Sequence, residues 1–251
     1  MYPVSRILPF LAVALAVVAS TPQRAPANET SELMKAIQAN DVRWVRAEIA
    51  AGANVKGDVR PLREAVIHGY VPIARALIEG GAEVNGLGYP LNAAARAGQA
   101  ETVALLIQRG ADVNARDLTG YTPLIEAVLA SNGLEAAKLL LAAKADPYTK
   151  SQSSCTCAEN ALQWAAYQGN VAIAELLLAV GMDIDVQAGA EAHYPGYTPL
   201  HYAARFSQFA MVDYLIEHGA AVNMRDKYGE TPLSVAFDPR VKALLTKAGG
   251  E

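Results

Sequence analysis

The segments GYTPLIEAV at residues 120–128, GYTPLHYAA at 196–204 and GETPLSVA at 229–236 are near-copies of one another. A second kind of segment, such as GADVN at 110–114, also recurs along the chain. Self-similarity of this kind at a regular spacing indicates a repeat architecture. The 251 residues are therefore expected to form a row of similar units, rather than one or two ordinary globular domains.

A leucine in the first kind of segment defines the repeat. Successive leucines are 29, 29, 33, 38, 38 and 33 residues apart, at Leu33, Leu62, Leu91, Leu124, Leu162, Leu200 and Leu233. In five of the first six units, a glycine follows 19 residues after the leucine. In the remaining unit, Lys144 takes the place of this glycine, 20 residues after Leu124. The packed part of each unit thus has nearly constant length, and the variation lies in the connections.

The residue types within a unit predict two short helices and a defined stop. A threonine before a proline is a good helix start. The threonine hydroxyl accepts a hydrogen bond from a free amide of the first turn, and the proline has no N–H that would need a partner. Thr122, Thr198 and Thr231 occupy this position, and Ser31 and Asn160 are predicted to cap two units that lack it. A glycine then ends the second helix in the left-handed conformation. Two short helices cannot bury both their apolar faces alone, whereas a stack of pairs can.

These phased segments resemble the ankyrin-repeat family over residues 30–250 or so. The resemblance implies an all-α solenoid of about seven helix-turn-helix units, with β-hairpin-like loops projecting to one side and a concave surface. The predicted domain covers residues 28–251, with units near residues 30–57, 58–86, 87–117, 118–150, 151–187, 188–226 and 227–251. Polar residues at outward positions of the first and last units predict capping repeats, and hence an array that is complete at both ends.

The N-terminal residues differ in kind from the repeats. Arg6 precedes an apolar run from Ile7 to Ala19, which is too short to cross a hydrocarbon core of about 30 Å as a helix. Residues 1–27 are therefore predicted to hold a signal peptide and a short spacer, with cleavage after Ala27 or nearer the apolar run. The mature chain would be periplasmic or secreted, with no membrane association after cleavage. An uncleaved anchor is the alternative.

Several classes of function find no support in the sequence. The formal net charge is −4 and no long basic run occurs, which argues against a nucleic-acid partner. The four histidines show no metal-ligand spacing, and neither a catalytic serine motif nor a phosphate-binding glycine loop is present. We therefore expect no enzymatic activity, no metal and no cofactor, and a chain that is monomeric by itself.

Cys155 and Cys157 are the only two cysteines of the chain. Three interpretations stay open. A disulfide would stiffen a loop tip, as expected for an exported chain without other cysteines. A redox-active pair is the second interpretation, since so small a ring is strained and reducible. Half of a soft-metal site is the third, although other ligands are missing.

Candidate partner-binding residues follow from the resemblance. In the family, the residues two, five and six positions after the helix-start leucine tend to face the concave side. In units four to six, beside two long connections at residues 145–161 and 182–199, this rule and the nearby loop give Glu126, Leu129, Trp164, Tyr167, Gln168, Tyr197, Tyr202, Arg205 and Phe206. Tryptophan, tyrosine and arginine most often anchor interfaces. The alternative is that some of these aromatic rings pack beneath the long loops as core.

The favoured hypothesis is a protein–protein interaction scaffold outside the cytoplasm, which binds another protein on its concave face around units four to six. One alternative is an immunity or protective protein that inhibits a secreted or periplasmic toxin or enzyme, since a mildly acidic surface suits a basic target. The other is a redox or stress-related factor that acts through Cys155 and Cys157.

Overall fold

A computed structural model of the chain describes residues 26–87, 89–151 and 158–251. The predicted signal-peptide core and the Cys155–Cys157 pair lie outside the described residues. Within them the fold is all-α. The helices are α1 Pro26–Gln38, α2 Val42–Ala50, α3 Arg60–Ile67, α4 Val71–Glu79, α5 Pro90–Arg96, α6 Ala100–Gln108, α7 Pro123–Leu129, α8 Leu134–Ala142, α9 Ala161–Gln168, α10 Val171–Ala179, α11 Pro199–Arg205, α12 Phe209–Glu217, α13 Pro232–Val235 and α14 Pro239–Lys247.

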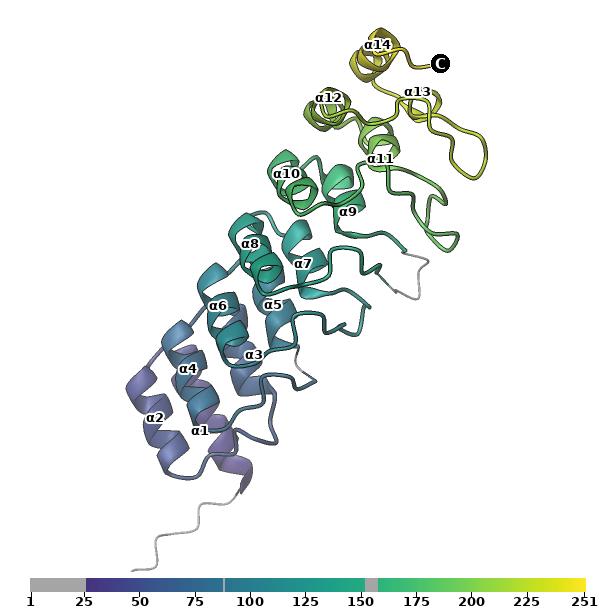
Figure 1. The fold of residues 1–251 in the computed structure, drawn as a ribbon. Coiled ribbons are helices and arrows are strands. Elements are labelled where there is room, and N and C mark those ends of the chain that lie inside the picture. Colours follow the sequence, from purple (N-terminus) through teal and green to yellow (C-terminus); the bar gives the residue numbers. More distant parts are fainter. Residues whose placement is uncertain (1–25, 88, 152–157) are drawn as a thin grey trace, which may run out of the picture.

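Consecutive helices form pairs, and the pairs stack into an elongated array (Figure 1). The first helices of the pairs, α1 to α13 by odd numbers, pack on one another in one layer, and the second helices form the other. The connections between pairs all project beyond the first layer, to the right in Figure 1. The all-α solenoid predicted from the repeat spacing is confirmed. We call the surface formed by the first helices and the projecting connections the inner face.

The projecting connections have the form of hairpins without containing strands in the part of the chain that is described. Isolated backbone hydrogen bonds close several of them. Asp117 N–H donates to the Tyr121 carbonyl at 3.0 Å, and Asp226 N–H donates to the Glu230 carbonyl at 2.9 Å. The connections therefore keep a hairpin shape through isolated turns rather than through a β-ladder.

The helix starts follow the predicted chemistry, with one exception. Thr122 accepts a bond from the Ile125 amide at 3.3 Å, and Asn160 forms a reciprocal cap with Gln163. The prediction that Ser31 caps the first helix was wrong. Helix α1 begins at Pro26 and runs through Ser31, because a proline is well suited to the first helical turn and lies five residues upstream.

The helix stops also follow the sequence pattern. The glycine at this position adopts a positive φ, as in Gly110 at 80°. Lys144 keeps the same conformation with a φ of 69°, although a side chain in this region costs on the order of 1 kcal/mol. The geometry of the stack therefore overrides the residue preference at this one position.

The core runs continuously along the array. The helix-start leucines of the first six units are at most 2% exposed, whereas Leu233 in the last unit is half-buried. None of the helices in the described ranges has the length and apolar character needed to cross a membrane. Stacking thus buries the leucine row in every unit except the last.

Candidate functional site

Four of the predicted residues line one hollow on the inner face. Trp164 and Tyr167 come from α9, and Tyr202 and Phe206 come from α11 and its C-terminal end. The hollow has a volume of about 280 Å³, and its lining, here called the aromatic pocket, consists of Glu159, Gln163, Trp164, Tyr167, His193, Tyr194, Tyr202 and Phe206. The structure therefore brings the predicted aromatic residues of units five and six together around a shared cavity.

The rings of the pocket touch one another edge to face. Trp164 contacts Tyr167 with ring centroids 5.6 Å apart, and Tyr167 contacts Phe206 at 4.4 Å. Tyr194, from the long connection before α11, closes the set with a centroid 6.0 Å from that of Phe206. Such contacts add stability beyond the burial of area and hold the rings in fixed orientations. The pocket wall is therefore preformed.

A carboxylate lies in this aromatic wall. Glu159 is only 4% exposed, and the Tyr202 hydroxyl donates to its Oε1 at 2.8 Å. Among the described residues, its Oε2 is buried without a hydrogen-bond partner, as is Nε1 of Trp164. Burial, together with the negative charge of Glu159, raises the pKa of the Tyr202 phenol well above its ordinary value. The phenol therefore stays protonated and serves as a donor to Glu159.

Glu159 was missed by the sequence analysis. It lies in the connection directly before the cap residue Asn160, outside the positions that the repeat rule assigns to the inner face. The available signal was an acidic residue beside a helix start in an unusually long connection. That signal gives no partner, because Tyr202 lies 43 residues away in the chain.

Other predicted residues are less accessible than expected. Glu126, Tyr197 and Tyr202 are 1%, 2% and 3% exposed. The prediction that these three side chains lie on an accessible surface is corrected by their burial. The connection at residues 182–199 places Tyr194 over the inner layer, so that Tyr197 stacks on both Tyr194 and His201. The core interpretation therefore describes Tyr197 better, while Tyr202 forms a wall of the pocket from within.

The remaining predicted residues lie outside the pocket lining. Leu129 is half-buried and Gln168 is exposed. The guanidinium of Arg205 lies 5.2 Å from the ring centroid of Tyr194 and 5.2 Å from that of Phe237. Arg205 therefore braces the outer side of the aromatic cluster, where cation–π contact is favourable.

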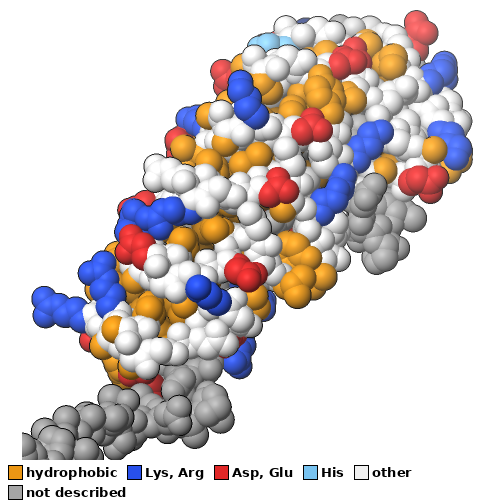
Figure 2. All heavy atoms as spheres, turned by 60° about the horizontal axis from the view of Figure 1, so that its bottom comes forward, with side chains coloured by type: hydrophobic (Ala, Val, Ile, Leu, Met, Phe, Trp, Pro, Cys, Tyr) orange, Lys and Arg blue, Asp and Glu red, His pale blue; other side chains and the backbone are white. Residues whose placement is uncertain are grey.

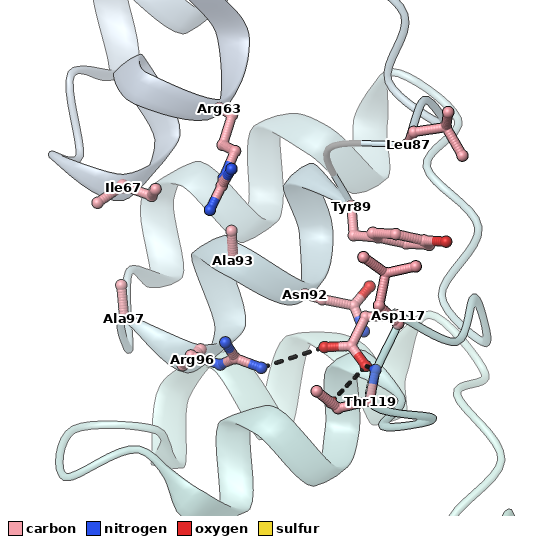
Figure 3. A pocket seen from close by; sticks show the side chains of 11 residues that line it. Arg63, Ile67, Leu87, Tyr89, Asn92, Ala93, Arg96, Ala97, Asp117 and Thr119 are labelled. Carbon is pink, nitrogen blue, oxygen red and sulfur yellow. Dashed lines mark hydrogen bonds and ion pairs between the residues drawn. The ribbon is translucent and has the colours of Figure 1, made fainter. Parts of the chain in front are cut away.

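A second hollow lies on the inner face at units two to four (Figure 3). Its volume is about 440 Å³, and it is lined by Arg63, Ile67, Leu87, Tyr89, Asn92, Ala93, Arg96, Ala97, Asp117, Leu118 and Thr119. We call it the N-terminal groove. Leu87 and Leu118 in the connections are 80% and 88% exposed. The predicted binding site did not include these residues, although the positional rule also places Ile67, Ala93 and Arg96 on the concave side.

Glu126 is held inside the array by an ion pair below this groove. Arg96 Nε donates to Glu126 Oε2 at 2.8 Å, and its Nη2 contacts both Glu126 Oε1 and Asp117 Oδ2. Figure 3 shows the guanidinium directed at Asp117, which also accepts a bond from the Thr119 hydroxyl. Burial raises the pKa of the Glu126 carboxyl and the Arg96 bond opposes this rise. Glu126 therefore joins two units rather than facing a partner.

The described residues hold no clustered metal ligands, and the surface in Figure 2 is of mixed character. In the described ranges, no group of three or more histidine, cysteine, aspartate or glutamate residues is placed to hold a metal ion. Figure 2 shows one face of the molecule, on which hydrophobic side chains alternate with acidic and basic ones along the array.

Comparison with known proteins agrees with this architecture. The family described as ankyrin repeats, in three copies, matches residues 85–151, 130–226 and 162–249. The solved ankyrin repeat domain of human ASB11 is 28% identical, with a TM-score of 0.74 over 87% of this chain and 98% of that domain. The putative ankyrin repeat protein YahD of Escherichia coli is 36% identical over 93 residues, 34% of this chain and 44% of YahD.

Two larger proteins match over shorter stretches. Ankyrin repeat and SOCS box protein 11 of Danio rerio is 37% identical over 73 residues, and palmitoyltransferase AKR1 of Lachancea kluyveri is 32% identical over 77 residues. These stretches are 29% and 31% of this chain, but only 23% of the fish protein and 10% of the yeast one. Together with the family match across most of the array, these similarities show that the chain belongs to the ankyrin-repeat family.

Proposed function

We propose that the chain acts outside the cytoplasm as a scaffold that binds another protein along its inner face, from the N-terminal groove to the aromatic pocket. Ankyrin-repeat domains are generally protein–protein interaction scaffolds, and we assign the inner face to the concave side that the family resemblance implies. The extracytoplasmic location rests on the apolar run from Ile7 to Ala19 behind Arg6.

The observation that carries the binding proposal is the pair of exposed leucines at the N-terminal groove. Leu87 and Leu118 project from neighbouring connections and border a cavity of about 440 Å³, to which Ile67, 42% exposed, also contributes. Clustered exposed apolar side chains around a hollow mark interaction sites, whereas single exposed ones do not. The preformed aromatic pocket extends the same face to units five and six.

The binding proposal can be tested by comparing three versions of the mature chain as bait in the extracytoplasmic fraction of cells that produce it. The groove variant carries Leu87→Asp and Leu118→Asp. The control carries Val180→Asp, a matched substitution at a half-exposed valine after α10. We expect a partner that binds the wild type and the control but not the groove variant. Recovery of the same proteins by all three baits would contradict the proposal.

The location requires its own experiment. Cell fractionation with intact-mass measurement is expected to find a chain shortened within residues 1–27 outside the cytoplasm. A full-length chain confined to the cytoplasm would overturn this part of the proposal and leave the binding face unaffected.

A further inference from the structure

The aromatic pocket contains an unsatisfied acceptor that a simple apolar docking surface would not have. Glu159 is 96% buried, since 4% of its surface is exposed, and only its Oε1 is engaged, by Tyr202. Oε2 has no hydrogen-bond partner in the described structure. A buried carboxylate oxygen without a partner is costly, and a charged donor is the group that compensates it best. Glu159 belongs to the pocket lining, so a cationic donor that enters the pocket would compensate this oxygen.

The rings around Glu159 favour the same kind of ligand. Trp164, Tyr167 and Phe206 line the hollow, and the faces of such rings attract cations. The chain itself provides an example at the outer edge of the cluster, where the Arg205 guanidinium lies 5.2 Å from the Tyr194 ring centroid. Arg205 is not part of the pocket lining, so it leaves the cavity of about 280 Å³ open.

A second unsatisfied group indicates that the ligand also carries a hydrogen-bond acceptor. Nε1 of Trp164 is buried without an acceptor among the described residues, and Trp164 belongs to the same lining as Glu159. A ligand that fits the pocket should therefore carry a cation for Glu159 and a carbonyl oxygen for Trp164. A basic residue within a polypeptide has both, because its side chain ends in the cation and its backbone offers the carbonyl.

We propose that the aromatic pocket receives a lysine or arginine side chain of the partner protein, with its cationic group bound to Glu159 Oε2 and its alkyl stem packed against the rings. This inference rests on the proposed protein-binding function and specifies the chemistry of the partner. His193 and Arg205 are the other ionisable side chains beside the rings, and neither replaces the missing donor to Glu159.

The pocket can be probed without knowing the partner. The chain has two tryptophans, so Trp44→Phe makes Trp164 the sole tryptophan reporter. The probes are a blocked Gly-Lys-Gly peptide, its arginine counterpart, and its norleucine counterpart, which has the same stem without the charge. We expect a saturable change in Trp164 fluorescence with the lysine or arginine peptide, at least about tenfold tighter than with norleucine. Equal responses to the charged and neutral peptides would overturn the inference, and this comparison needs no variant of Glu159.

The role of Glu159 is tested by Glu159→Gln, which keeps an acceptor for Tyr202 but removes the charge. The control is Glu101→Gln, an exposed glutamate of α6. We expect the first change to weaken binding of the charged peptides at least about tenfold and the second to leave it unchanged. Tetramethylammonium serves as a free cation without a backbone. If it binds more tightly than the charged peptides, the pocket serves a small molecule and the inference is wrong.

The inference and the proposed function can fail separately. If a captured partner depends on Leu87 and Leu118 but binds equally well to Glu159→Gln and Glu101→Gln, the pocket inference is wrong and the scaffold function stands. If the charged peptides bind selectively but capture finds no partner that depends on the inner face, the cation site is supported and the scaffold function is contradicted.

Discussion

The Tyr202 hydroxyl donates a hydrogen bond of 2.8 Å to Glu159 Oε1, across 43 residues of sequence. The bond joins helix α11 to the connection that precedes helix α9. It fixes one wall of the aromatic pocket. The second oxygen of Glu159, Oε2, accepts no hydrogen bond in the described structure. The stability of this region and the proposed cation binding therefore depend on the same carboxylate.

Tyr202→Phe should lower the free energy of unfolding by about 1.5–3 kcal/mol, because a hydrogen bond to a charged, buried carboxylate is lost while the ring stays in place. Urea unfolding followed by circular dichroism measures the change. The matched control is Tyr148→Phe, which removes a hydroxyl bond to the Gly181 carbonyl at an exposed site. The control should lose less than about 1.5 kcal/mol. Equal losses in the two variants would show that the Glu159 bond is worth no more than an ordinary surface bond.

Arg96→Met should destabilise the chain because Glu126, 1% exposed, would lose its main partner. A loss of about 1–3 kcal/mol is expected: the partly exposed guanidinium limits the loss, whereas the anion Asp117 then lies beside an unpaired Glu126 and adds repulsion. Adding Glu126→Gln to Arg96→Met should recover part of this loss, because the variant then buries no unpaired charge. Urea unfolding of the two single variants and the double variant measures the coupling. Strictly additive effects would contradict the ion pair as a link between units.

The burial of Tyr197 should make the free energy of unfolding fall at alkaline pH. Burial raises the pKa of its phenol from the ordinary value of 10.0 to about 12. A raised pKa in the folded state means that the unfolded chain ionises first, so stability is complete below about pH 10 and falls as the pH rises from 10 towards 12. Tyr197→Phe should flatten this part of the dependence. The test is the urea midpoint of both proteins between pH 8 and pH 11, and identical slopes would argue against the buried phenol.

The sequence predicted the parts of the fold that local chemistry decides. Threonine before proline marked helix starts such as that at Thr122, and the leucine spacing located the stop at Lys144 even without a glycine. The repeat rule also selected four of the pocket residues. It could not anticipate the acceptor Glu159 or the burial of Tyr197, because both depend on how the long connections fold over the inner layer. Those connections differ in length from unit to unit, so no periodicity constrains them.

Lys144→Gly should stabilise the chain, because Lys144 adopts a left-handed conformation with a φ of 69° that glycine reaches without steric cost. The expected gain is roughly 0.5–1 kcal/mol, since the relief of strain is partly offset by the greater freedom of glycine in the unfolded chain.

The reciprocal change Gly110→Lys tests the same position in the preceding unit. At Gly110 the φ is 80° and an added Cβ would meet no atom within 4 Å, so only the backbone conformation should cost energy. Gly110→Lys should therefore lose about 1 kcal/mol. Lys144→Ala serves as the control, because alanine shares the steric restriction and should bring no gain. If alanine stabilises as much as glycine, the effect belongs to the lost lysine charge and not to the backbone.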